Sequence, residues 1–213
     1  MSAARDAPLD VYVVTSSGHV PGRGYREVAR GAVEGGATAV QLRAPELSDA
    51  ELLSLAHELA EHCHERNVLF IVNNSLEVAL ESGADGVHLG QADQPERARD
   101  RLRADMVLGV SVDAPEQARA AEDLGASYVA ATVWRSTTKP EALPLGLDGL
   151  RRTCLATSLP VVGIGGITPS NAADVLAVGA AGVAVVSAVA AASDPVAATR
   201  ELVEAVRAFR EER

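Results

Sequence analysis

The chain has 213 residues, of which 47% are hydrophobic and 23% are charged, and its formal net charge is −10. This length and apolar content fit one domain with a sizeable core and exclude wholesale disorder. The acidic balance argues against a general nucleic-acid or anionic-membrane binder, and two Phe, three Tyr and one Trp leave no aromatic platform for stacking bases.

Eight short apolar runs recur along the chain, and β-branched residues are frequent in them. Each run is nearly continuous in apolar character, which is typical of a strand buried on both faces. The predicted strands are 11–14, 38–42, 68–72, 86–89, 106–110, 127–131, 160–163 and 182–186.

Helix start and stop signals lie between these runs. Ser48 with Glu51 makes a capping box, and proline in a first turn marks other starts. Further predicted starts are Asp113 with Glu116, Thr168-Pro169 and Asp194-Pro195, and the predicted stops are Gly35, Gly83, Gly125 and Gly179.

Eight strands that alternate with eight helices give about 27 residues per unit. This spacing predicts an α/β protein with a single (β/α)8 TIM barrel, one domain over residues 1–213, whose eighth helix follows Asp194. A doubly wound open sheet is the competing architecture. No linker or low-complexity tract divides the chain.

Polar or glycine-rich segments follow nearly every predicted strand. Chemistry in such barrels occurs on loops at the carboxyl ends of the strands, and a purely structural barrel would not need polar residues there. These exits are therefore the candidate active site. They comprise Gln41 and Arg43, Asn73-Asn74, His88, Gln91 and Asp93, Ser111, Thr132, 135–139, 163–168 and Ser187.

The seventh exit is rich in glycine. Loops after strands seven and eight are the usual phosphate site of this fold, and glycines let backbone amides approach an anion. Gly165, Gly166 and Ser187 are therefore a candidate cradle for a phosphomonoester. A tight turn that needs positive φ is the alternative explanation for the two glycines.

Two cations are predicted to lie around the same rim. Arg43 and Lys139, with the amide of Asn73, suit a polyphosphate better than a neutral ligand. Asp93 can hold a divalent cation that bridges such a polyphosphate, because Mg²⁺ takes one or two carboxylates together with phosphate oxygens. Lys139 is also the single lysine among 19 basic residues.

Two cysteines, Cys63 and Cys154, are too few for a disulfide framework and suit a reducing cytoplasm. The N-terminus lacks the apolar core of a signal peptide, no run is long enough for a transmembrane helix, and we expect a cytoplasmic protein. The 62–64 segment, His-Cys-His, resembles a metal motif, but consecutive helical residues diverge too far to share one ion. His88 is as well suited to holding its loop or contacting a ligand as to acting as a general base.

Five segments in chain order resemble those of the thiamine phosphate synthase family. The match extends over nearly the whole chain, from the first predicted strand to Val185-Val186-Ser187, and the pair of segments through His88-Leu89-Gly90-Gln91 and Gly165-Gly166 is the most specific. The segments are 40–43, 84–93, 109–111, 138–139 and 163–168.

The resemblance implies an enzyme that joins a hydroxymethylpyrimidine diphosphate to a thiazole phosphate, which forms thiamine phosphate and releases pyrophosphate. It implies a dissociative, Mg²⁺-assisted mechanism, in which the diphosphate leaves first and the thiazole nitrogen captures a pyrimidine methyl cation. Such a step needs cations around the leaving pyrophosphate and little general-base chemistry, in agreement with the anion binders predicted above.

The resemblance also assigns roles to individual positions. The substrates would be phosphorylated small molecules, Mg²⁺ the cofactor, and Arg43, Ser111 and Lys139 the catalytic residues. In full, Gln41 and Ser111 would contact the pyrimidine or its leaving group, Arg43, Asn73 and Lys139 the diphosphate, Asp93 and Asn74 the Mg²⁺, and Ser136, Thr138, Gly165, Val186 and Ser187 the thiazole phosphate.

Two positions depart from the family pattern. Pro45 stands where the family has a lysine, and Asn74 stands where it has an aspartate on Mg²⁺. One cation and one anion are lost, so the formal charge of the site is unchanged. An amide oxygen still ligates Mg²⁺ but carries no charge, so weaker metal binding is expected.

Two alternatives follow from these departures. TenI-type thiazole tautomerases share the barrel but use a histidine after the sixth strand, where this chain has Thr132. A regulatory protein that binds a thiazole phosphate without catalysis is the other. The oligomeric state stays open, a homo-oligomer included.

Overall fold

Eight parallel strands close into a barrel in the computed structural model, which describes residues 7–135 and 143–212. The strands follow one another in chain order, and β1 pairs with β8, with Tyr12 opposite Ala184. This closure confirms the predicted (β/α)8 barrel over an open sheet. The strands are β1 (Val11–Val14), β2 (Ala39–Leu42), β3 (Leu69–Asn73), β4 (Gly86–Leu89), β5 (Val107–Val112), β6 (Tyr128–Thr132), β7 (Val161–Ile164) and β8 (Gly182–Val185).

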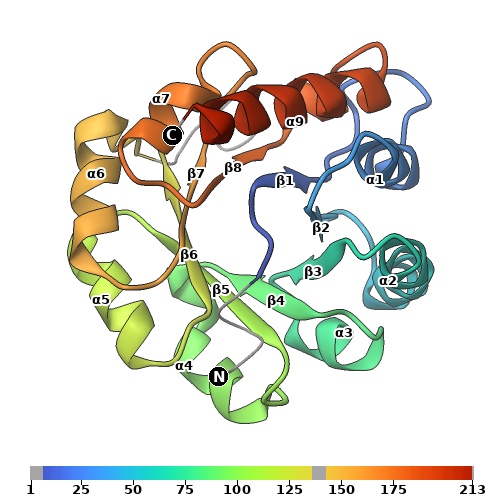
Figure 1. Ribbon diagram of the computed structural model, residues 1–213. Helices are drawn as coiled ribbons and strands as arrows, with labels where there is room; N and C mark the ends of the chain where they lie inside the picture. Colours follow the sequence, from blue (N-terminus) through green and yellow to red (C-terminus); the bar gives the residue numbers. More distant parts are fainter. Residues whose placement is uncertain (1–6, 136–142, 213) are drawn as a thin grey trace.

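Helices surround the barrel and cover its outer face (Figure 1). A 3-10 turn, η2 (Gln91–Asp93), and a short helix, α8 (Ser187–Ala190), add to the predicted pattern. The other helices are α1 (Tyr25–Glu34), α2 (Asp49–His64), α3 (Leu76–Glu81), α4 (Pro95–Arg101), α5 (Pro115–Asp123), α6 (Gly146–Ala156), α7 (Ala172–Ala177) and α9 (Pro195–Glu211). In the described part of the chain, no helix is long and apolar enough to cross a membrane.

Two of the predicted helix starts are correct and two are not. The Ser48 hydroxyl and the Glu51 carboxylate cap α2 reciprocally, and the Asp194 carboxylate accepts from the first turn of α9. By contrast, α5 begins at Pro115 with Ala114 as its N-cap, because the Asp113 N–H donates to Gln117 Oε1 instead of taking part in a capping box. The segment after Thr168 forms a turn, and α7 starts only at Ala172.

The apolar side chains form two clusters, as the alternation of strand side chains requires. One lies between the strands and the helices and includes Phe70, Leu59 and Leu150. The other fills the barrel interior and includes Tyr12, Ile71, Val107, Tyr128 and Val162.

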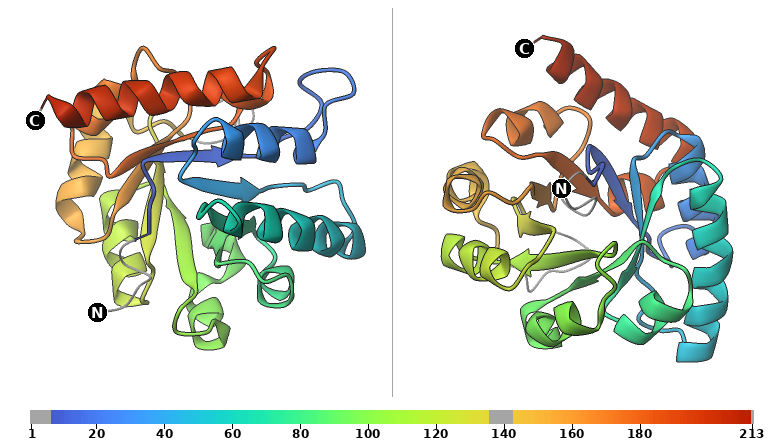
Figure 2. Two further views of the ribbon diagram at one scale, coloured as in Figure 1. Left: turned by 45° about the vertical axis from the view of Figure 1, so that its right-hand side comes forward. Right: turned by 60° about the horizontal axis from the view of Figure 1, so that its bottom comes forward.

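The last helix lies between α7 and α1 and covers the closing strand pair (Figure 2). Gly31 of α1 permits this approach, because a Cβ at that position would lie 2.6 Å from Pro195 Cβ. Gly35 meets α9 in the same way, since a Cβ there would lie 2.7 Å from the carbonyl oxygen of Val196. The predicted stop Gly35 is the C-cap of α1 and also a packing position.

Candidate active site

A pocket opens at the carboxyl ends of the strands, on the side of the barrel where the sequence predicted the chemistry. Seven of the eight strands, β2 to β8, contribute residues of the predicted exits to it, because their carboxyl ends converge at this end of the barrel. The predicted site residues that line it are Gln41, Arg43, Asn73, Ser111, Gly165 and Val186, and His88 and Thr132 lie among them.

A second pocket adjoins the first and shares Gly165 and Val186 with it. Gly166, Ser187 and the cationic side chain of Arg135 complete its polar lining. The structure confirms the positive φ angles of the alternative explanation, and both glycines also line this pocket. Gly165 and Gly166 have φ angles of +94° and +67°, and a side chain on Gly165 would collide with the backbone of Trp134.

Ser187 opens α8, the short helix that follows β8 directly. A short extra helix after the eighth strand is a recurrent part of the phosphate site in this fold. The second pocket thus brings together the two glycines and the hydroxyl predicted for a phosphomonoester cradle, and it adds the guanidinium of Arg135, which was not part of that prediction.

Polar side chains in the barrel interior form a connected network below the first pocket. Gln41 Nε2 donates to Tyr12 Oη over 2.5 Å, and Tyr12 Oη lies 2.8 Å from Tyr128 Oη. His88 joins this network to the pocket, with Nδ1 2.9 Å from Tyr128 Oη and Nε2 2.9 Å from Ser111 Oγ. His88 is therefore a buried, hydrogen-bonded side chain in contact with a predicted catalytic residue.

Arg43 stands on the rim, where hydrogen bonds hold its backbone. Its N–H donates to Thr15 Oγ1, so the ends of β1 and β2 are tied together. Nearby, Ser17 Oγ donates to Glu46 Oε1 over 2.6 Å, and this hydrogen bond lowers the pKa of the Glu46 carboxyl. The first loop is thus joined to the loop that carries Arg43.

The two predicted metal ligands follow neighbouring strands but do not line either pocket. The Asn74 N–H donates to the carbonyl oxygen of His88, and Asp93 Oδ2 accepts from the Gly90 N–H over 2.8 Å. Both side chains are exposed. Ser136, Thr138 and Lys139, which the sequence also places at the site, lie outside the described residues.

Two arginines near the site differ in what they contact. The Arg23 guanidinium donates to the carbonyl oxygens of Ala192 and Ser193, whereas Arg135 lines the second pocket. Of the two, Arg135 is the one placed to bind an anion there.

Sequence reasoning missed three polar residues of this region. Tyr12 and Asp113 line the first pocket, and Tyr128 lies beneath it. Tyr12 and Tyr128 belong to apolar strand runs and appeared as core residues. Asp113 directly follows β5, and its place in a strand exit was the signal that could have identified it.

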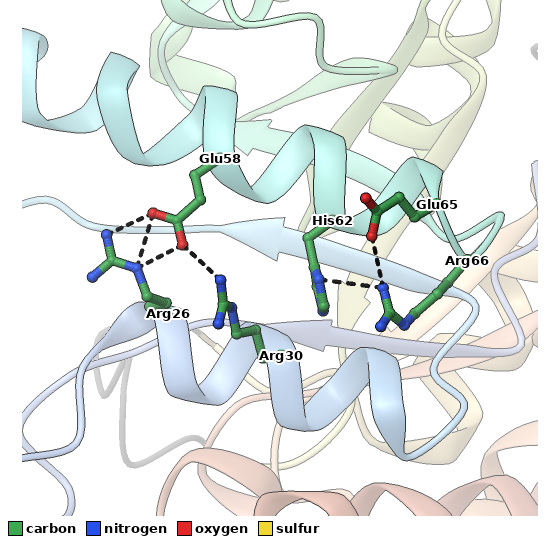
Figure 3. Close-up of polar contacts among 6 residues, drawn as sticks. All are labelled: Arg26, Arg30, Glu58, His62, Glu65 and Arg66. Carbon is green, nitrogen blue, oxygen red and sulfur yellow. Dashed lines mark hydrogen bonds and ion pairs between the residues drawn. The ribbon is translucent and has the colours of Figure 1, made fainter.

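The 62–64 segment contacts three different surroundings. Arg66 Nη1 donates to His62 Nδ1, the Cys63 side chain is buried in the core, and His64 Nε2 lies 3.2 Å from Asp85. Figure 3 shows His62 facing Arg66, beside the ion pairs of Glu58 with Arg26 and Arg30 that join α2 to α1. The side chains diverge as consecutive helical positions require.

Together these features define a (β/α)8 barrel with a polar, cation-lined site at the carboxyl ends of its strands. A sequence model of the family described as thiamine monophosphate synthase matches residues 11–189. The chain therefore belongs to the thiamine monophosphate synthase family.

Individual relatives agree with this assignment over nearly their whole length. The chain is 46% identical to a thiamine-phosphate synthase of Moorella thermoacetica, over 92% of this chain and 95% of the relative. It is 45% identical to a thiamine-phosphate synthase of Natronomonas pharaonis, over 92% and 94%. The solved structure of a thiamine phosphate pyrophosphorylase from Pyrococcus furiosus superposes with a TM-score of 0.88 at 38% identity, over 95% of this chain and 98% of that one.

Proposed function

We propose that the chain condenses a hydroxymethylpyrimidine diphosphate with a thiazole phosphate to give thiamine phosphate and pyrophosphate. The observation that carries this proposal is the pair of contiguous pockets, which share Gly165 and Val186. One is lined by an amide, a hydroxyl and a guanidinium, and the other has the composition of a phosphate cradle. Two phosphorylated substrates seated side by side match this arrangement.

In the first pocket, Gln41 and Ser111 would contact the pyrimidine and its leaving group. Arg43, Asn73 and Lys139 would bind the diphosphate and stabilise the charge that develops as it leaves. In the second pocket, Gly165, Val186 and Ser187, with Ser136 and Thr138 of the adjoining segment, would hold the thiazole phosphate. Holding both substrates in one orientation lets the thiazole nitrogen reach the pyrimidine methyl carbon once the pyrophosphate departs.

We propose Mg²⁺ as the cofactor, with Asp93 and Asn74 as its protein ligands. Carboxylate and amide oxygens are ligands that Mg²⁺ accepts, and their exposure leaves room for water and phosphate oxygens. Bound there, the ion would neutralise charge on the diphosphate. The Gly90 N–H holds one carboxylate oxygen of Asp93 and so orients the other.

The relatives favour a synthase over a thiazole tautomerase, and so does the end of β6. Thr132 lines the first pocket at the position where a tautomerase would carry its histidine. A threonine hydroxyl is a poor proton acceptor near neutral pH, whereas an imidazole titrates there. The site is thus better equipped for diphosphate departure than for proton transfer on a thiazole.

We place the reaction in the cytoplasm, because both Cys63 and Cys154 are free thiols.

A two-substrate assay tests the proposal. We expect pyrophosphate release and thiamine phosphate formation only when both substrates and Mg²⁺ are present. Chromatography of the reaction mixture identifies the product. Isomerisation of the thiazole phosphate without condensation would establish the tautomerase instead. Binding of both substrates, measured by calorimetry, without turnover would establish a regulatory protein.

A further inference from the structure

Four hydrogen bonds link Gln41 to Ser111 through the barrel interior. They run from Gln41 to Tyr12, on to Tyr128 and His88, and end at Ser111, with donor–acceptor distances from 2.5 to 2.9 Å. We call this row of hydrogen bonds the hydrogen-bond chain, and its two ends, Gln41 and Ser111, line the first pocket. The middle is shielded from water, since Tyr12 is 1% exposed, Tyr128 0% and His88 6%.

A glycine, which has no side chain, makes room for the centre of the hydrogen-bond chain. Gly109 of β5 is the register partner of His88 on one side and of Tyr128 on the other. A Cβ on Gly109 would collide with the Tyr128 hydroxyl group and with His88 Nδ1. The two rings therefore meet above the glycine, with centroids 5.5 Å apart and a 33° tilt.

The hydrogen bonds have a defined direction that starts at Gln41. Its amide nitrogen is the donor to Tyr12 Oη, so the Tyr12 proton is available for Tyr128. If Tyr128 donated to Tyr12 instead, the Tyr12 oxygen would accept from both Gln41 and Tyr128. The Tyr12 proton would then be buried without an acceptor, which is costly. Burial raises the pKa of both phenols, so each keeps its proton at neutral pH.

The same logic determines the tautomer of His88. Because Tyr128 accepts from Tyr12, its own proton points to His88 Nδ1, which must be the bare nitrogen of the ring. The proton of a neutral imidazole then resides on Nε2 and is donated to Ser111 Oγ. Ser111 accepts from His88, so its hydroxyl proton is left for the pocket.

We propose that Tyr12, Tyr128 and His88 are positioning residues that set the hydrogen-bonding polarity of the substrate pocket. They hold Gln41 with its carbonyl oxygen toward the ligand and Ser111 with its hydroxyl proton toward the ligand. Given the proposed function, on which this inference rests, Gln41 Oε1 then accepts from the amino group of an aminopyrimidine, and Ser111 donates to an anionic oxygen of the diphosphate. The reversed chain would present an N–H to the amine and lone pairs to the anion.

The direction of the chain predicts different effects at its two ends. In Tyr12→Phe the Gln41 amide loses its acceptor and is free to flip, whereas Tyr128 still donates to His88. In Tyr128→Phe the His88 Nδ1 loses its donor and the Tyr12 proton loses its acceptor, so both ends of the hydrogen-bond chain are released. A merely structural role of the two phenols would instead give both variants the same effects.

The tautomer of His88 is measured by ¹⁵N NMR of the imidazole nitrogens in the full-length protein without substrate. We expect a bare Nδ1 and a protonated Nε2 in the unsubstituted protein and in Tyr12→Phe, and a mixture of tautomers in Tyr128→Phe. Tyr25→Phe is the matched control, because it removes a phenol hydroxyl outside the chain, and it should leave the tautomer unchanged. A protonated Nδ1 in the unsubstituted protein would overturn the proposal.

Substrate selectivity reports on the other end. We expect Tyr12→Phe to reduce the preference for the aminopyrimidine diphosphate over its oxo analogue about tenfold in kcat/KM, mainly through a higher KM for the amino substrate. Tyr128→Phe should reduce this preference as well and, in addition, lower kcat about tenfold. Equal losses of kcat in both variants would refute the directional chain. The expected tautomer without any condensation would instead refute the proposed function alone, because the NMR measurement needs no turnover.

Discussion

Single residues place polar groups in the barrel interior, which is otherwise apolar. Tyr12 and Tyr128 belong to the interior cluster with Ile71 and Val162, yet their hydroxyl groups have hydrogen-bond partners. Buried polar groups are tolerated when they are satisfied, and a satisfied network holds its members in one geometry. At this scale the site depends on which atom of each side chain donates.

Asn74 is the residue at which the metal proposal is most directly tested. Asn74→Asp gives the proposed metal site a second carboxylate ligand, so we expect the Mg²⁺ concentration for half-maximal activity to fall several-fold. The measurement is a magnesium titration of initial rates. Asn67→Asp is the control, because Asn67 has a left-handed backbone with φ +57°, close to the φ +60° of Asn74, and lies away from the strand exits. It should leave the titration unchanged. An unaltered titration in Asn74→Asp would place position 74 away from the metal.

At the level of elements, local signals predicted strands better than helix starts. The runs 11–14 and 86–89 match β1 and β4 to the residue, because a buried strand is a short apolar segment with few alternatives. The segment after Thr168 failed as a helix start, since Asn171 Oδ1 accepts from the Thr168 N–H and Asn171 Nδ2 donates to the Gly166 carbonyl oxygen. These hydrogen bonds hold the residues after Thr168 in the loop beside the second pocket, so they do not form the first turn of α7.

The N-cap of α9 gives a prediction at this scale. Asp194 Oδ1 accepts from the N–H groups of Val196 and Ala197, at 2.9 and 3.2 Å. Asp194→Ala should lower the free energy of unfolding by about 1 kcal/mol, whereas Asp194→Asn should retain most of it. Urea unfolding followed by circular dichroism measures both. Equal stability of all three proteins would show that the cap contributes nothing.

The whole molecule is held by closure of the sheet and by one continuous core between barrel and helices. Cys63 lies in that core with 0% exposure, and burial raises the pKa of its thiol to about 12. Cys154 is half-buried, and burial raises the pKa of its thiol to about 11. Folding therefore keeps protons on groups that ionise more easily in the unfolded chain.

This difference makes stability depend on alkaline pH. Between about pH 9 and pH 12 the unfolded chain loses the Cys63 proton while the folded protein keeps it. The free energy of unfolding should consequently fall as pH rises through this window. Cys63→Ala should flatten that slope, which denaturant titrations at several pH values would measure. A slope equal to that of the unsubstituted protein would contradict the buried, protonated thiol.

The sequence by itself determined the fold class, the strand positions and most of the pocket, because a buried parallel strand and its polar exit are both local patterns. Gln41, Arg43, Asn73 and Ser111 were predicted in this way and line the pocket. Only the tertiary structure decided that Tyr128 and His88 meet over Gly109 and that Tyr12 reaches Tyr128, since these residues come from three strands and their contact depends on register. The direction of the hydrogen bonds between them is a property of the closed barrel, because it arises only when all the groups are buried together.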